Sequence, residues 1–250
     1  MAGLPDAYGP PPGWGEDGLT AYLEQAVRNR WATFAHYQPT IRNLARIDAQ
    51  FVPLAGIKDP PNLVALHLGF RSHSNFRALC EHALAGQLGD LFPMVRACLE
   101  AAAYSVHVHG DPALTEAWLR RHEPDGMKAF KQNKFSQTAV RQSIDRHDPE
   151  LSALYNELYQ QAIDLGAHPN ERGLSANAKL VPHPEGKQFL MIYLHENGPQ
   201  LRFGLHAALE AGVAAVAMLR LVFPKVLGCD EPVHREFRAK LRAARATFDE

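Results

Sequence analysis

The stretch from Gly69 to His109 constrains the fold more than any other, because its apolar spacing predicts two antiparallel helices joined by one tight turn. We expect the first helix from about Ser74 to Gln87 and the turn at residues 86–90. Asp90 is expected to cap the second helix, and Pro93 then falls in its first turn, where a missing N–H costs nothing. The apolar stripe of the second helix consists of Leu88, Leu91, Val95, Leu99, Ala102 and Val106.

The rest of the chain predicts one bundle of helices that is interrupted once by strands. Further helices are expected near residues 19–37, 111–122, 127–147, 148–166, 205–223 and 234–248. Residues 188–195 are instead continuously apolar and β-favouring, and Asn197-Gly198 is a strong hairpin signal before a return strand at 201–204. The predicted fold class is therefore all-α, a single helical bundle with a small β-hairpin insertion near 187–204.

The composition is that of a folded globular protein, with 46% hydrophobic and 21% charged residues in a chain of 250. A formal net charge of −1 gives no overall field that would attract nucleic acid or a membrane surface. The three widely spaced cysteines exclude a disulfide framework and are typical of a reducing cytoplasm. We divide the chain into a flexible arm rich in Pro and Gly, 1–18, and a single helical domain, 19–250.

The segment from Leu205 to Phe223 is the one candidate for a membrane span. It contains His206, Glu210 and Arg220, which are costly inside a bilayer, and its many small residues are ordinary for a close-packed core helix. We therefore expect a buried helix and no membrane contact. The N-terminus lacks the pattern of a secretory signal, so we expect a cytoplasmic protein.

Arg96, Glu100 and His107 lie on one line of the second helix of the central pair, beside its apolar stripe. Arg96 and Glu100 are one turn apart and can form an ion pair. One interpretation is a weak helical ion pair that only orients two helices. The other is the charged floor of a pocket, in which Glu100 raises the basicity of a histidine while Arg96 and His107 contact a substrate such as a phosphate.

His168, Asn170, Glu171 and Arg172 follow directly after the end of a predicted helix, where loops often carry function. One interpretation is a rigid cap, in which Pro169 fixes the backbone and Asn170 bonds it locally. The other makes His168 a general acid or base, because the unperturbed pKa of histidine lies near neutrality, with the other three side chains binding the substrate.

The sequence predicts no metal and no cofactor. It has 13 histidines, but no His–Glu pattern of a zinc hydrolase and no closely spaced cysteine pair. It also has no nucleophile elbow and no Gly-rich phosphate loop. The basic residues of the last predicted helix, 234–248, are expected to form a solvated face rather than an RNA site.

Three segments carry a resemblance, and they read LGFRSHSNFRALCEHALAGQLGDLFPMVRACLEAAAY, AWLRRH and LYQQAIDLGAHPNERG. Together they resemble a group of uncharacterised bacterial all-helical proteins that is loosely similar to HEPN-like domains. The resemblance covers about residues 66–173 and, vaguely, the last helix. It implies a compact helical bundle, often dimeric, and HEPN-like proteins include metal-independent ribonucleases.

Active HEPN-like ribonucleases use an arginine that is followed closely by a histidine. This chain has matching spacings at Arg30 to His36, Arg77 to His82 and Arg141 to His147. None of these arginines is followed by the polar Asn or Asp that commonly completes the motif. We therefore carry over no catalytic residue from the resemblance.

Two hypotheses for function follow from the sequence. The first is a non-catalytic module that self-associates as a homodimer or binds a protein partner, and it predicts an apolar patch exposed on the monomer. The second is a metal-independent ribonuclease with His168 as acid or base, Arg96 or Arg172 steadying the phosphate, and Glu100 or Asn170 orienting the groups. We favour the first.

Overall fold

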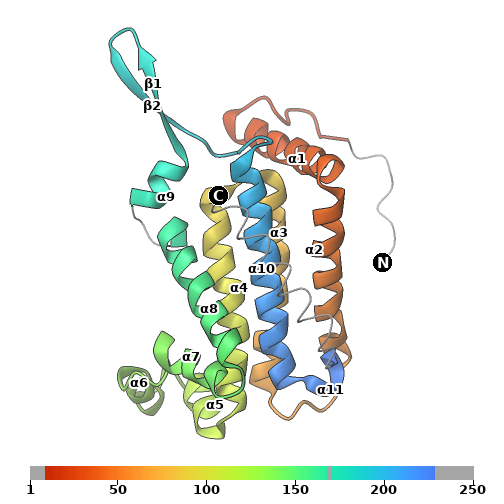
Figure 1. Ribbon diagram of the computed structural model, residues 1–250, viewed down its shortest axis with the longest axis vertical. Helices are drawn as coiled ribbons and strands as arrows, with labels where there is room; N and C mark the ends of the chain where they lie inside the picture. The colour runs from red at the N-terminus through yellow and green to blue at the C-terminus, as the bar shows by residue number, and fades with distance from the viewer. Residues whose placement is uncertain (1–8, 168–170, 229–250) are drawn as a thin grey trace.

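The computed structural model describes residues 9–167 and 171–228 and has the shape of an elongated helical bundle (Figure 1). The structure is 74% helical, and within the described ranges strands occur only in one antiparallel hairpin. The predicted all-α bundle with a small hairpin insertion is confirmed. The helix predicted at 234–248 and residues 1–8 of the predicted arm lie outside the described residues.

The N-terminal part forms two helices and a short 3-10 turn. These are α1 (Gly18–His36), α2 (Gln38–Phe51) and η1 (Val52–Gly56). Asp17 caps α1, because its carboxylate accepts the main-chain N–H groups of Leu19 and Thr20 at 2.8 and 2.9 Å. The break expected near Pro39 occurs at Tyr37, and Pro39 lies in the first turn of α2, where its missing N–H leaves no helical bond unmade.

The predicted antiparallel pair is present as α3 (Leu63–Ala85) and α4 (Leu88–His109). Gly86 ends α3 in the left-handed conformation, with φ at 76°. A Cβ atom on Gly86 would lie 2.2 Å from the main-chain oxygen of His195, so only glycine allows the chain near residue 195 to pack against this turn.

The start of α4 differs from the prediction. Gln87 is the N-cap residue, so Asp90 lies within the first turn rather than at the cap, and Pro93 lies inside the helix. The side chains of Leu88 and Leu91 are 5% and 0% exposed. Burying them as part of the helix outweighs the local preference for an aspartate cap, since tertiary packing overrides such propensities.

Four shorter helices follow, of which the first three lie at the lower end of the bundle and the fourth runs back beside α4 (Figure 1). These are α5 (Pro112–Leu119), α6 (Pro124–Lys131), α7 (Gln137–Asp145) and α8 (Pro149–Ala162). The predicted caps at Asp111 and Asp148 are confirmed, with hydrogen bonds of 2.8 and 2.9 Å from main-chain N–H groups. After α8 the chain makes a wider turn, η2 (Ile163–Ala167), in which Gly166 has a φ of 146° that ends the helical path.

The hairpin lies earlier in the chain than predicted. The elements after η2 are α9 (Glu171–Ala176), β1 (Ala178–His183), β2 (Gly186–Met191), α10 (Pro199–Val222) and α11 (Pro224–Leu227). The expected first strand overlaps β2, but the expected return strand at 201–204 belongs to α10. Pro199 suits the first turn of a helix, and Leu201 and Leu205 are buried on one face of it, so a helical period begins where we expected a strand.

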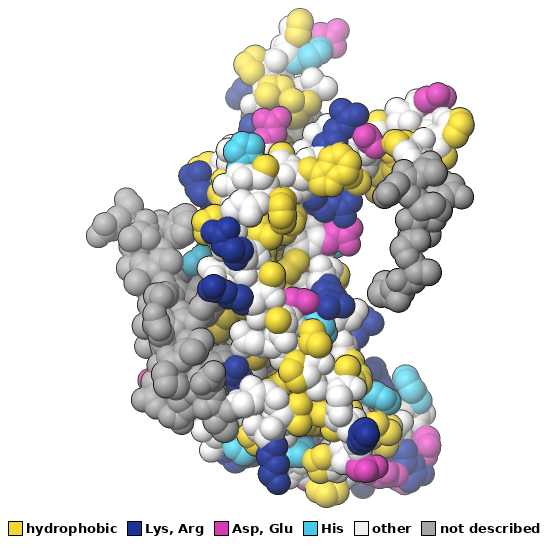
Figure 2. Space-filling model, turned by 90° about the vertical axis from the view of Figure 1, so that its right-hand side faces the viewer, with side chains coloured by type: hydrophobic (Ala, Val, Ile, Leu, Met, Phe, Trp, Pro, Cys, Tyr) yellow, Lys and Arg dark blue, Asp and Glu magenta, His cyan; other side chains and the backbone are white. Residues whose placement is uncertain are grey.

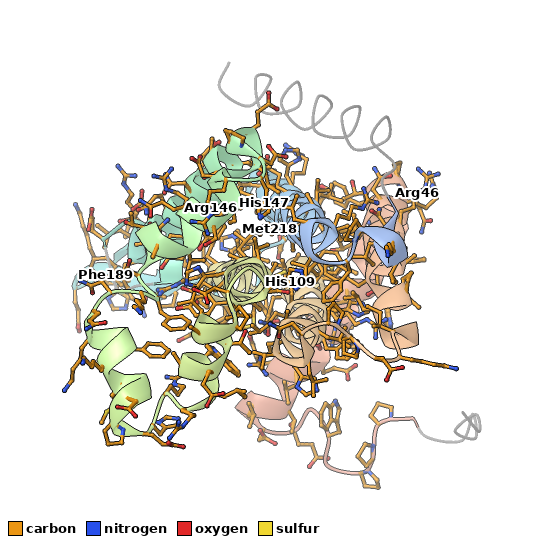
Figure 3. The ribbon with its side chains drawn as sticks, turned by 90° about the horizontal axis from the view of Figure 1, so that it is seen from below. Arg46, His109, Arg146, His147, Phe189 and Met218 are labelled. Carbon is orange, nitrogen blue, oxygen red and sulfur yellow. The ribbon has the colours of Figure 1, made fainter. Side chains whose placement is uncertain are left out.

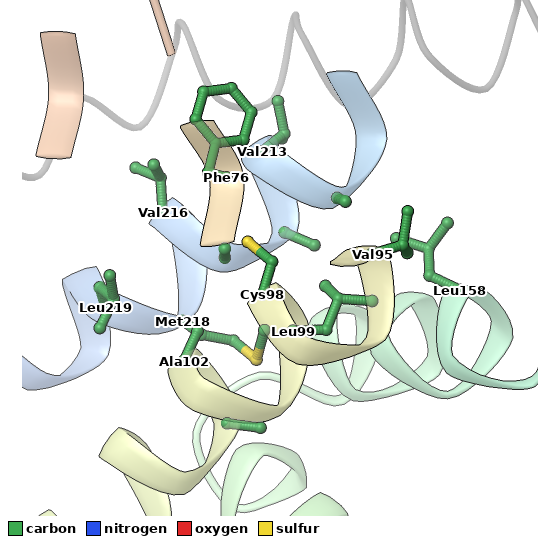
Figure 4. Close-up of a cluster of buried hydrophobic side chains, with 14 of the residues drawn as sticks. Phe76, Val95, Cys98, Leu99, Ala102, Leu158, Val213, Val216, Met218 and Leu219 are labelled. Atoms are coloured by element: carbon green, nitrogen blue, oxygen red, sulfur yellow. The ribbon is translucent and has the colours of Figure 1, made fainter. Parts of the chain in front are cut away.

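The core lies where α4 and α10 pack side by side, with α2, α3 and α8 around them (Figure 1). Figure 4 shows Phe76 from α3, Leu99 from α4 and Met218 from α10 within one buried cluster. Gly212 allows a close approach, because a Cβ atom there would lie 2.4 Å from the ring of Phe76. Among the described residues, α10 is the one helix long and apolar enough to cross a membrane. Inside the protein, 83% of the apolar 18-residue stretch of this helix is buried. Its predicted place in the core is therefore confirmed.

Candidate functional site

The predicted pair of Arg96 and Glu100 forms on α4 and faces α8. Arg96 Nε donates a hydrogen bond to Glu100 Oε1 at 2.9 Å. The guanidinium carbon of Arg96 also lies 5.2 Å from the ring centre of Tyr159 on α8, which is within cation–π distance. The two charged side chains are 28% and 35% exposed. The pair is therefore half-buried between two helices and still reachable from solvent.

Three tyrosines surround this ion pair, and the sequence analysis did not single them out. Tyr155 and Tyr159 come from α8 one turn apart, and Tyr104 comes from α4. Burial raises the pKa of all three phenols, and the negative charge of Glu100 raises each pKa further. The phenols therefore stay protonated at neutral pH. The cluster offers a cation, a carboxylate and aromatic walls to a small polar group.

His107 does not join this cluster, although the sequence placed it on the same line of α4. By helical rise it lies about 10 Å beyond Glu100 along the axis. Its Nε2 donates to the main-chain oxygen of Lys134 at 2.8 Å, and its Nδ1 accepts the hydroxyl of Ser143 at 2.7 Å. Burial lowers the pKa of His107, in keeping with this neutral tautomer. Both ring nitrogens are occupied, so His107 links α4 to α7 and has no free nitrogen for a substrate.

The predicted loop site is only partly described. His168 and Asn170 lie outside the described residues, and their predicted roles stay predictions. Glu171 and Arg172 are exposed and begin α9. Arg172 forms an ion pair with Asp164 across 3.3 Å, with 69% and 51% of the two side chains exposed. Such an exposed pair orients α9 against η2 only weakly.

A cavity of about 320 Å³ lies at the base of the hairpin. It is lined by the first turn of α4, by α9 and by the residues that leave β2, including Asp90, Leu174, Met191 and Tyr193. The carboxylate of Asp90 is exposed there. Gly89 also lines the cavity, and its main-chain oxygen lies 3.2 Å from where a Cβ atom on Gly166 would be. Pro93 has no N–H to donate to this oxygen. Apolar walls and oxygen acceptors therefore meet at this end of the bundle.

A buried contact between Asn177 and His195 anchors the base of the hairpin. Asn177 Nδ2 donates to the main-chain oxygen of Gly173, so its Oδ1 accepts from His195 Nε2 at 2.9 Å. Burial lowers the pKa of His195, and the charge of Lys179 lowers it further, which favours the neutral ring. The main-chain N–H of His195 donates to Gly86 at 2.8 Å. The chain after β2 is thus fixed to the turn between α3 and α4.

The hairpin itself projects beyond the bundle (Figure 1), and Figure 3 shows Phe189 at the periphery, far from core residues such as Met218. Cross-strand partners share a face, so Leu180 and Phe189 lie on one face together with Ala178 and Met191. Phe189 is 75% exposed, Leu180 49% and Met191 47%. Hydrophobic side chains are visible at this end of the molecule in Figure 2. The hairpin therefore has an apolar face that the described part of the chain leaves uncovered.

The described residues contain neither a metal-binding cluster nor a reactive thiol. Within residues 9–167 and 171–228, no three or more His, Cys, Asp or Glu side chains gather in a way that could hold a metal ion. Burial raises the pKa of the Cys98 thiol to about 12, and the same cause raises that of Cys80 to about 12. Thiols with such a pKa remain protonated and are poor nucleophiles.

The sequence patterns did not lead us to two features of the candidate sites, the tyrosines of α8 and the apolar face of the hairpin. The tyrosines at 155 and 159 had a visible signal, since their spacing of four places them on one helix face. The apolar face of the hairpin had one too, because residues 187–191 alternate across a strand once its register is known. That register could not be read from the sequence, since Asn197-Gly198 offered a stronger turn signal than Pro184-Glu185.

Comparison with known protein families, with curated proteins and with solved structures finds no match to this chain. The resemblance to HEPN-like domains therefore stays a prediction.

Proposed function

We propose that the protein is a non-catalytic self-associating module and that its projecting hairpin is the element through which it associates. The observation that carries this proposal is the uncovered apolar face of Leu180, Phe189 and Met191. Apolar patches of this kind on soluble proteins mark interaction surfaces. A lone two-stranded hairpin is also only marginally stable in water, so a covering chain stabilises the hairpin as well as the complex.

The anchored base of the hairpin supports the same proposal. The Asn177–His195 contact and the hydrogen bond to Gly86 fix where the hairpin leaves the bundle. A binding element on a fixed base loses less conformational entropy on association than a loop that is free to move. The base of the hairpin is therefore fixed in position, while every side chain of β2 remains exposed and available to a partner.

The test is sedimentation velocity over a wide range of protein concentration. The wild type should associate as concentration rises. Leu180→Ser with Phe189→Ser should weaken association more than about tenfold, since burial of each of these apolar side chains contributes about 2 kcal/mol. Leu119→Ser is the matched control, because Leu119 is 57% exposed but lies in α5 at the other end of the bundle (Figure 1).

Two outcomes would contradict the proposal. One is a wild type that stays monomeric at every concentration. The other is a double hairpin variant that associates as strongly as the wild type and the Leu119→Ser control.

A second candidate, a metal-independent ribonuclease, is favoured by the half-exposed pair of Arg96 and Glu100 beside Tyr159. An arginine in this setting suits a phosphate, and His168 is the predicted acid or base. RNA cleavage in the presence of EDTA tests it, with His168→Ala and Glu100→Gln as variants of equal thermal stability. Cleavage by the wild type that both variants lose supports this candidate, and no cleavage of several RNAs by the wild type rejects it.

A further inference from the structure

We infer that the chain which covers the hairpin is a second copy of this protein, with the two β2 strands paired edge to edge and antiparallel about a two-fold axis near Phe189. This inference rests on the proposed self-association and adds its geometry. The result would be one continuous four-stranded sheet, in the order β1, β2, partner β2, partner β1. Its apolar face would be shared by both copies.

The two edges of the hairpin are not equally able to pair. β1 contains Pro182, which has no N–H to donate to another strand. β2, Gly186–Met191, contains no proline, and each of its residues is exposed. In an antiparallel ladder, every second residue of a strand directs its N–H and C=O away from the first partner. The free edge of β2 therefore presents a regular row of donors and acceptors, which is a template for another strand.

A two-fold axis makes this edge complementary to itself. Two antiparallel copies of one strand exchange the same hydrogen bonds in both directions, as an isologous interface requires. With the axis at Phe189, the two Phe189 side chains lie opposite each other, and Lys187 lies opposite the partner's Met191. These residues share the apolar face with Leu180, so the pairing joins two small patches into one.

The register also brings opposite charges together. The tip of one hairpin would reach the base of the other, where the exposed Asp90 lines the cavity. Lys187 stands near the tip. Neither Lys187 nor Asp90 has an ion-pair partner in the described part of the chain. An ammonium group beside a carboxylate is a favourable match, and the two-fold symmetry forms this contact twice.

The dimensions agree with this placement. β2 has 6 residues, and at about 3.4 Å per residue it spans roughly 20 Å. The two bundles would then lie at opposite ends of the shared sheet, each beside the tip of the other hairpin. The apolar area of one hairpin face is modest, so we expect a reversible dimer at the small end of specific interfaces.

Charge reversal tests the register. Lys187→Glu and Asp90→Lys should each raise the dissociation constant of the dimer about tenfold at low salt, by removing two attractions and adding two repulsions. The combined Lys187→Glu and Asp90→Lys variant should recover most of the wild-type affinity. Glu185→Lys at the tip is the control for a general effect of net charge. If the double variant binds no better than the single variants, the proposed contact of Lys187 with Asp90 is wrong.

A disulfide tests the axis. Hydrogen-bonded partners in an antiparallel pair have Cα atoms about 5.5 Å apart, within the range that a disulfide can bridge. Phe189→Cys, in a Cys229→Ser background, should give a covalent dimer under mild oxidation, whereas Glu185→Cys should not. A wild type that dimerises through the hairpin, with neither this cross-link nor charge rescue, would overturn the strand pairing and leave self-association standing. A wild type that never dimerises would instead overturn the proposed function.

Discussion

The bundle core and the hairpin use apolar residues in opposite ways. In the core, Phe76 is 1% exposed and lies among side chains of α10 and α2. In the hairpin, Phe189 is 75% exposed, and Leu180 and Met191 on the same face are 49% and 47% exposed. The core obtains its stability from within one chain, because α4 and α10 bury nearly every apolar side chain between their neighbours. The hairpin has no such cover among the described residues, and under the proposed self-association its apolar face would be buried only in a complex.

The difference shows that one residue type can belong to a folding core or, under the proposed self-association, to a binding surface. Burial of a phenylalanine contributes about 2–3 kcal/mol whether the covering atoms come from the same chain or another. What distinguishes the two regions is the concentration dependence of that gain. Core packing is intramolecular and independent of protein concentration, whereas burial of the hairpin face by a second chain would follow mass action.

The largest expected effect on stability comes from Phe76→Ala, and Phe189→Ala is the variant with which it is compared. Phe76→Ala should lower the free energy of unfolding by about 3–5 kcal/mol, since it leaves a cavity between α3 and α10. Phe189→Ala should change it by less than about 0.5 kcal/mol in dilute solution, because its ring is already in water. Urea unfolding followed by circular dichroism measures both. A cost for Phe189→Ala near that of Phe76→Ala would mean that the hairpin packs within its own chain.

A second test concerns the closest approach inside the core. A Cβ atom on Gly212 would lie 2.4 Å from the ring of Phe76 and 2.8 Å from Ile47. Gly212→Ala should therefore destabilise the protein by about 1–3 kcal/mol through overpacking, in spite of the better helix propensity of alanine. Gly56→Ala is the control, because nothing lies within 4 Å of that position. Equal melting temperatures for the two variants would show that α10 can move away from α3.

A third test uses the pH dependence of stability to measure the contribution of the buried, neutral ring of His107. Burial lowers the pKa of His107 below its ordinary value of 6.5, so the unfolded chain binds the proton first as pH falls. The stability due to neutral His107 is therefore complete above pH 6.5 and is lost as pH falls from 6.5 toward the folded pKa.

The variant for this test is His107→Gln, which should cost about 1 kcal/mol near neutral pH by removing a buried hydrogen bond. It should also reduce the loss of stability in acid. Urea unfolding at a series of pH values measures both effects. An NMR titration in which the ring of His107 protonates at or above 6.5 would contradict the buried, neutral state.

Much of the fold could be predicted because it depends on short-range signals. The apolar stripe of α4 and the Asp-Pro starts at Asp111 and Asp148 are local patterns, and the structure has all of them. The starts of α4 and α10 could not be predicted, because each depended on burial by distant segments. The hairpin was misplaced for another reason, since Asn197-Gly198 is a stronger local turn signal than Pro184-Glu185. Leu88 is held in the core by Gly204 of α10, where a Cβ atom would lie 2.4 Å from the Leu88 side chain.

Of the candidate site, only the residues that share one face of α4 could be predicted from the sequence. Arg96 and Glu100 are one turn apart, and their contact follows from spacing alone. Which other groups join them depends on the packing of α8 and α7 against α4, which the sequence does not show directly. That packing brings Tyr159 to the pair, and it instead encloses His107 between Ser143 and the oxygen of Lys134.

The smallest expected effect on stability concerns that pair. Glu100→Gln should change the free energy of unfolding by at most about 0.5 kcal/mol, because a partly exposed helical ion pair is screened by solvent. It should nevertheless lower the pKa of Tyr159, since burial and then the charge of Glu100 raise that pKa above 10.0. Ultraviolet titration of the phenolate, with Glu157→Gln on the same helix as Tyr159 as control, measures the shift. An unchanged titration curve would mean that Tyr159 does not sense Glu100, and the cluster would then be a packing contact rather than an electrostatic unit.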